Sequence, residues 1–106
     1  MTGSEKQVIS QYVEGNPAEV YQAWLNVVWR GGGGLGPIPP SIVQEGDKTT
    51  GKDCIRAVPG GINEHIIEAN GKNKIVYRVK SGPFPVSYHL GTVEFLQTFS
   101  GTQVVW

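Results

Sequence analysis

The feature that most constrains the fold is the second half of the chain, where four apolar segments follow one another with only short separators. Two separators contain Asn70-Gly71 and Ser100-Gly101, dipeptides that accept the positive φ of tight turns. Segments this close can pair only antiparallel, because a parallel return needs a crossover of about a dozen residues. The sequence therefore predicts an antiparallel meander over Ile62–Ala69, Lys74–Lys80, Val86–Thr98 and Thr102–Trp106.

Length and composition set the class of protein. The chain has 106 residues, so we expect one domain over residues 1–106. Nine basic and nine acidic residues give a formal net charge of zero, which argues against a nucleic-acid partner. No apolar run approaches the roughly 20 residues of a membrane span, and the N-terminus carries no apolar signal-peptide core. We therefore expect a cytoplasmic protein with no membrane span.

A helix is predicted to begin at Asn16, a residue that suits the N-cap position. Pro17 follows at the first helical position, where its missing N–H costs nothing, and Glu19 stands where a capping box needs it. The glycine run from Gly31 ends the helix. The apolar stripe of this helix is expected to comprise Val20, Tyr21, Trp24, Leu25 and Val28.

Three further strands are predicted around this helix, at Gln7–Val13, Ser41–Glu45 and Asp53–Val58. Together with the meander they define an α+β fold, in which a curved antiparallel sheet follows an N-terminal helix. A sheet of this kind is expected to curve around something, so the question of function becomes the question of what it encloses.

Several patterns that could carry chemistry do not meet its requirements. The glycine run Gly31–Gly36 lacks the Gly-Lys-Ser/Thr of a phosphate loop and follows a helix, whereas phosphate loops precede one. A single cysteine, Cys54, excludes an internal disulfide and is expected to be a buried core thiol. His65 and His89 are too few for a metal ligand set. We expect neither a metal nor a cofactor.

Strand periodicity predicts which side chains share the interior. In the second strand of the meander, apolar Ile75, Tyr77 and Val79 alternate with basic residues, a pattern typical of a half-buried strand. We expect these side chains to share one face with two further sets, which are Ile62, Glu64, Ile66 and Glu68, and Val86, Tyr88 and Leu90.

This assignment places a carboxylate, Glu64, on the inner side of the sheet. A buried carboxylate is costly unless it is paired or hydrogen-bonded, and Arg56 on the neighbouring strand is the natural partner. Two interpretations of the pair remain open. It is either a structural ion pair at the end of the sheet or a polar contact for a bound ligand.

Taken in order, these segments resemble the helix-grip fold of the START-like or SRPBCC superfamily, which includes polyketide cyclases, birch-pollen-type allergens and plant abscisic-acid receptors. The uncharacterised polyketide cyclase/dehydrase-like branch is the most similar. The resemblance covers nearly the whole chain and rests on Asn16–Trp24, Gly51–Arg56, Asn63–Ala69, Ile75–Val79, Phe84–Tyr88 and Gly101–Trp106.

The resemblance implies a cavity for apolar ligands between the concave face of the sheet and a long C-terminal helix. Glu64 and Tyr88 match positions that line this cavity in the abscisic-acid receptor branch. The Ser-Gly-Leu-Pro-Ala gate of that branch is replaced by Val58–Gly61, so a hormone-receptor function is not expected. The chain ends at Trp106 with the last strand still running. We therefore expect either a truncated product or a homo-oligomer that covers the open face.

Two functions from different classes follow. The first is the binding of a small hydrophobic or amphipathic ligand, with Arg56 and Glu64 orienting its polar end. The second is a polyketide cyclase or dehydrase reaction, with Glu64 as general acid/base and Tyr88 as a donor to a carbonyl. The apolar walls of the ligand site are expected to be Ile66, Tyr77, Val79, Tyr88, Leu90 and Trp106.

Overall fold

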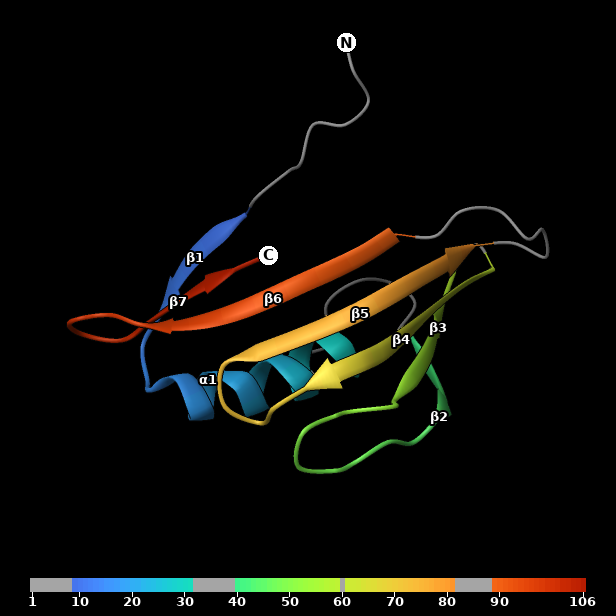
Figure 1. Ribbon diagram of the computed structural model, residues 1–106, viewed down its shortest axis with the longest axis horizontal. Helices are drawn as coiled ribbons and strands as arrows, with labels where there is room; N and C mark the ends of the chain where they lie inside the picture. Colours follow the sequence, from blue (N-terminus) through green and yellow to red (C-terminus); the bar gives the residue numbers. More distant parts are fainter. Residues whose placement is uncertain (1–8, 32–39, 60, 82–88) are drawn as a thin grey trace, which may run out of the picture.

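The computed structural model of the protein describes residues 9–31, 40–59, 61–81 and 89–106. Its fold is α+β, as predicted, with a curved, unclosed sheet of seven antiparallel strands in the order β1-β7-β6-β5-β4-β3-β2 (Figure 1). The strands are β1 (Ser10–Val13), β2 (Ser41–Gln44), β3 (Ile55–Val58), β4 (Ile62–Ala69), β5 (Lys74–Ser81), β6 (His89–Gln97) and β7 (Thr102–Val105).

The meander predicted from the turn dipeptides is confirmed, because β4, β5, β6 and β7 pair consecutively and antiparallel. Strand β4 has the predicted bounds, and β2 and β3 are shorter than predicted. Residues 7 and 8 of the first predicted strand, and residues 86–88 of the predicted strand Val86–Thr98, lie outside the described residues. Strand β1 extends the sheet by pairing with β7, so β1 and β2 form its two edges.

Helix α1 (Pro17–Trp24) begins with the predicted capping box. The Glu19 N–H donates to Asn16 Oδ1 at 2.9 Å, and the Asn16 N–H donates to Glu19 Oε1 at 3.2 Å. Both bonds satisfy amide groups that a helix start leaves without partners. The local sequence therefore fixes where the helix begins.

The helix continues as a π-helical turn, η1 (Leu25–Trp29), in which the Arg30 N–H donates to the Leu25 carbonyl at 3.0 Å. A π turn holds more residues than an α turn, so the apolar face shifts along the sequence. Trp29 is consequently buried and Val28 is 40% exposed. The predicted stripe is confirmed for Val20, Tyr21, Trp24 and Leu25 and is wrong for Val28.

The helix packs against one face of the sheet, here called the inner face. In β6 the alternation on this face is Gly91, Val93 and Phe95, and the last two are buried. The prediction that Leu90 points inward is wrong, because Leu90 is one residue out of phase and 56% exposed. Residues that share the hydrophobic core are Val20, Tyr21, Trp24, Leu25, Trp29, Cys54, Ile66, Ile75, Val93, Phe95 and Val104.

A β-bulge in β4 corrects a second prediction. Ile66 pairs with Tyr77, whereas Glu68 pairs with Val76, so Ile67 is an extra residue on this strand. An extra residue reverses the alternation beyond it. Glu68 is therefore exposed and does not share the face of Ile66, and its neighbour Ala69 packs against the core.

Candidate functional site

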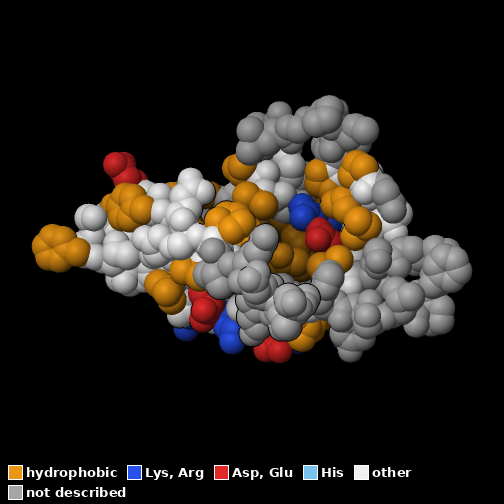
Figure 2. Space-filling model, turned by 90° about the horizontal axis from the view of Figure 1, so that it is seen from above, with side chains coloured by type: hydrophobic (Ala, Val, Ile, Leu, Met, Phe, Trp, Pro, Cys, Tyr) orange, Lys and Arg blue, Asp and Glu red, His pale blue; other side chains and the backbone are white. Residues whose placement is uncertain are grey.

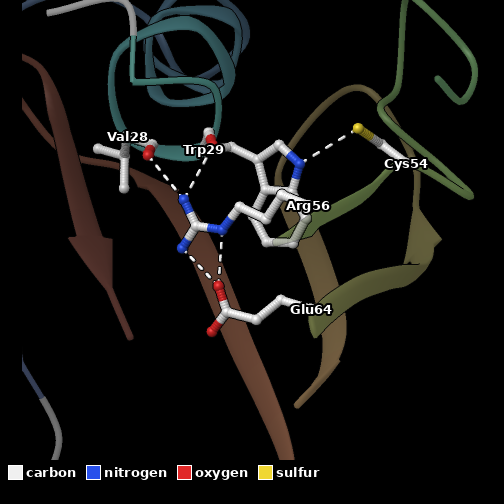
Figure 3. A network of polar contacts seen from close by, with 5 residues as sticks. All are labelled: Val28, Trp29, Cys54, Arg56 and Glu64. Carbon is white, nitrogen blue, oxygen red and sulfur yellow. Dashed lines mark hydrogen bonds and ion pairs between the residues drawn. The ribbon is translucent and has the colours of Figure 1, made fainter. Parts of the chain in front are cut away.

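The predicted pair of Arg56 and Glu64 is present. The two residues are opposite one another on β3 and β4. Both Nε and Nη2 of Arg56 lie 2.6 Å from one carboxylate oxygen, Glu64 Oε1 (Figure 3). The side chains are only 16% and 14% exposed. This is a largely buried, charge-assisted contact between neighbouring strands.

Arg56 also binds the end of the helix. Its Nη1 donates to the carbonyl oxygens of Val28 at 2.9 Å and Trp29 at 2.8 Å (Figure 3). Carbonyl groups at a helix C-terminus lack partners within the helix and carry partial negative charge, so a cation there is stabilising. Arg56 thus connects the sheet to the last turn of η1, a contact that the sequence analysis did not predict.

Trp29 is the residue of this site that sequence reasoning missed. The Arg56 guanidinium carbon lies 4.4 Å from the centroid of the Trp29 ring, a cation–π distance. The indole N–H donates to Cys54 Sγ at 3.2 Å, which confirms Cys54 as a buried thiol. The π turn hid Trp29 from the helical pattern. The signal that could have found it is a large aromatic residue at the very end of the helix.

Tyr77 stands beside this pair on β5. Its ring packs edge to face on Trp29, with centroids 5.9 Å apart. It also lies over Gly91 on β6, where an added Cβ would come within 2.3 Å of Tyr77 Cζ. Glycine at this position therefore makes room for the phenol. Burial raises the pKa of Tyr77, the charge of Glu64 raises it further, and Arg56 partly opposes the shift.

Two polar atoms of this cluster remain open. Among the described residues, neither Glu64 Oε2 nor the Tyr77 hydroxyl has a hydrogen-bond partner. Figure 3 shows the second oxygen of Glu64 directed away from the guanidinium. Viewed from above, the surface is hollowed where a basic and an acidic group lie side by side among hydrophobic side chains (Figure 2).

The other predicted wall residues differ in their placement. Ile66 is fully buried in the core, Trp106 is partly buried and packs against it, and Val79 is partly exposed. Leu90 lies on the opposite face and cannot line a site on the inner face. Tyr88 lies outside the described residues.

A pocket of about 360 Å³, which shares Trp29 and Cys54 with this cluster, opens between the helix and the segment that joins β2 to β3. The pair of Arg30 and Glu45 stands at its wall, with two hydrogen bonds of 2.9 and 2.8 Å. Its polar groups carry both signs of charge. Residues that line it include Gln22, Leu25, Asn26, Trp29, Arg30, Glu45, Asp47, Lys48 and Cys54.

The described part of the chain contains neither a cluster of metal ligands nor a membrane-spanning helix. No group of three or more His, Cys, Asp or Glu side chains there could hold a metal ion. No helix there is long and apolar enough to cross a membrane.

Comparisons with known proteins bear on the fold alone. No family model matches the sequence, and no curated protein matches it. A solved structure of an uncharacterised protein from Rhizobium leguminosarum is similar, with a TM-score of 0.59 and 20% sequence identity. The match covers 93% of this chain and 71% of that one. At this identity the likeness extends to the α+β architecture, which is compatible with a helix-grip fold.

Proposed function

We propose that this protein is a helix-grip domain of the START-like type that binds a small hydrophobic or amphipathic molecule on the inner face of its sheet. The observation that carries the proposal is the open polar cluster. Glu64 and Tyr77 keep an acceptor and a hydroxyl free beside Arg56 and the apolar ring of Trp29. Ligand sites typically combine apolar walls with a few placed polar groups.

A purely structural ion pair explains only part of this geometry. Arg56 holds the helix end and one oxygen of Glu64, which accounts for the pair as a connection between helix and sheet. It does not account for the second oxygen of Glu64 or for the hydroxyl of Tyr77. Polar atoms at partly buried positions are normally satisfied, so a ligand or solvent is expected to occupy them.

The cyclase or dehydrase alternative uses the same residues, with Glu64 as acid/base. No contact among the described residues favours this reaction over binding. The two differ in whether a bound molecule leaves unchanged, so mass spectrometry of the molecule recovered from the protein separates them.

Native mass spectrometry of the protein as purified, followed by NMR titration with 1-naphthol, tests the binding proposal. We expect shifts of the Trp29 indole N–H and of the Val79 amide, because both belong to the inner face. Val79→Trp should fill the site and weaken binding at least tenfold, whereas Leu90→Trp on the opposite face should not. Equal effects of the two substitutions would contradict a site on the inner face.

A further inference from the structure

The two edges of the sheet differ in how they are protected against further pairing. An open edge can accept another strand, and proteins protect such edges with bulges, charged side chains or proline. At β2 the pairing with β3 shifts register between Ile42 and Gln44, so the extra residue, Val43, interrupts this edge. Strand β1 pairs with β7 in unbroken register, and Ser10–Val13 contains neither a charged residue nor a proline. Of the two described edges, β1 is therefore the regular and unprotected one.

The hydrogen bonds to β7 show which main-chain groups of β1 remain available. Ile9 and Trp106 exchange hydrogen bonds, each N–H donating to the carbonyl of the other residue. Along an antiparallel strand such residues alternate with residues whose main-chain groups point away from the partner strand. Gln11 therefore also bonds to β7, whereas the N–H and C=O groups of Ser10 and Tyr12 point outward. No strand or helix of the described part of the chain lies on that side of β1 (Figure 1).

The outward main-chain groups of β1 are self-complementary. When two copies of β1 pair antiparallel about a two-fold axis at Gln11, Ser10 of each copy lies opposite Tyr12 of the other. Opposed residues whose main-chain groups point at each other exchange hydrogen bonds in an antiparallel pair. The same two residues therefore supply the donors and the acceptors on both sides of the axis.

The side chains of β1 also match those of a second copy. Residues 9–13 carry no charge, so the two-fold pairing brings no like charges together. The same register places Ile9, which is 50% exposed, opposite Val13 of the second copy, and apolar pairs of this kind stabilise neighbouring strands. A strand of another sequence would make the main-chain bonds without this apolar match.

We propose that β1 is an association edge, at which a second copy of this chain pairs through its own β1 and makes two seven-stranded sheets continuous. Strands β7 and β6 lie between β1 and β5, so the cluster of Arg56, Glu64 and Tyr77 stays outside this interface. The inference therefore stands or fails independently of the proposed ligand binding.

Sedimentation equilibrium of the protein at increasing concentration tests the inference. We expect a reversible dimer with a dissociation constant of about 100 µM, which is weak because a four-residue strand buries far less than the roughly 800 Å² per partner of a standard interface. A monomer at every concentration up to about 1 mM would overturn the inference.

Amide hydrogen exchange of Ser10 and Tyr12 locates the contact. We expect both amides to exchange freely in the dilute monomer and to become protected as the dimer forms, because their N–H groups are bonded only there. A dimer in which these amides stay unprotected would place the interface elsewhere and overturn the inference. Protection already present in the dilute monomer would overturn it too, because another segment of the same chain would then cover the edge.

Ser10→Pro tests the outward hydrogen bonds. It removes an outward N–H and spares the groups that face β7, so dimerisation should weaken about tenfold. Ser10→Ala keeps that N–H and is the matched control, with an unchanged dissociation constant expected. Equal dissociation constants for the two variants would contradict pairing through the main chain of β1.

Gln11→Lys tests the position of the axis. It brings two cations together there, so dimerisation should weaken about tenfold at low salt and recover in part at high salt. Val43→Lys, at the bulge of β2, is the matched control and should leave dimerisation unchanged. Should Ser10→Pro separate β1 from β7, Gln11→Lys decides, and equal effects of Gln11→Lys and Val43→Lys would count against the inference.

Discussion

Tyr21 and Tyr77 both pack in or against the core, but their hydroxyl groups differ in hydrogen bonding. The Tyr21 hydroxyl donates to the Thr50 carbonyl at 2.6 Å and accepts the Gly71 N–H at 3.0 Å. The Tyr77 hydroxyl has no such partner among the described residues. Burial is the main cause of a raised pKa in both. The Tyr21 hydroxyl uses both its donor and its acceptor within the protein and so holds loops together. The Tyr77 hydroxyl keeps both available for the proposed ligand.

The difference extends to the neighbours of each phenol. Tyr21 joins helix α1 to the segment before β3 and to the turn between β4 and β5, so its bonds tie together segments far apart in sequence. Tyr77 packs on Trp29 and over Gly91, contacts that fix its ring and leave its hydroxyl unused. The hydrogen bonds of Tyr21 thus connect separate segments, whereas the hydroxyl of Tyr77 makes no hydrogen bond to the described residues.

The largest effect on the free energy of unfolding is expected for Arg56→Ala, in the cluster that contains Tyr77. This change leaves Glu64 without its counter-charge and removes the donor to the helix end, so the free energy of unfolding should fall by about 3 kcal/mol. Arg30→Ala is the matched control, because its pair with Glu45 is exposed and should contribute little. Urea denaturation of both variants measures this. Equal losses would show that the buried pair does not hold the helix to the sheet.

The second prediction compares the two phenols directly. Tyr21→Phe should cost about 2 kcal/mol, because the Thr50 carbonyl and the Gly71 N–H lose their partner. Tyr77→Phe should change the free energy of unfolding by less than about 0.5 kcal/mol, since no bond within the described part of the chain is lost. Chemical denaturation under one set of conditions gives both values. A loss at Tyr77 as large as that at Tyr21 would mean that its hydroxyl is structural.

A smaller effect is expected at Gly91. A Cβ there would lie 2.3 Å from Tyr77 Cζ, so Gly91→Ala should displace the ring and cost about 1–2 kcal/mol. The double variant with Tyr77→Ala tests the cause, because the two changes should then be coupled by at least about 0.5 kcal/mol. Strict additivity of the two losses would contradict the close packing of Tyr77 over Gly91.

The smallest expected effect is on ionisation. Both phenols have pKa values above the ordinary 10.0, so the stability they contribute is complete below that pH. Above it the unfolded chain releases phenol protons first, and stability falls as the pH rises through the folded-state pKa values. Glu64→Gln should lower the pKa of Tyr77 and leave that of Tyr21 unchanged. NMR titration of the two rings follows this, and parallel shifts would show that Glu64 does not act on Tyr77 alone.

Local chemistry explains what could be predicted from the sequence. The short separators, two of which contain turn dipeptides, predicted the order and antiparallel pairing of β4 to β7, and the capping box predicted the helix start. Arg56 and Glu64 could be paired because adjacent strands place them opposite one another. Each of these features depends on residues that are close in sequence or in register.

The remainder depended on irregularities that leave no periodic trace. Because of the π turn, Trp29 is buried in place of Val28. The bulge at Ile67 reversed the alternation of buried and exposed side chains from Glu68 onward. For β6 the predicted alternation was wrong by one residue. The prediction placed Leu90 on the inner face, whereas the buried side chains are those of Val93 and Phe95. Tertiary packing decides such points, and the observed phase of β6 buries Val93 and Phe95 and places Gly91 under the ring of Tyr77.

The π turn has a consequence for how the chain can change in length. Its closing bond joins Arg30 to Leu25, five residues back, whereas an α turn closes on the fourth. Deletion of the exposed Asn26 would convert the turn to an α turn. Trp29 would then stay on its buried side of the helix and Arg30 on its exposed side. A deletion within Pro17–Trp24 would instead rotate everything beyond it by about 100°. Related chains that are one residue shorter within η1 are therefore expected to keep Trp29 against Arg56.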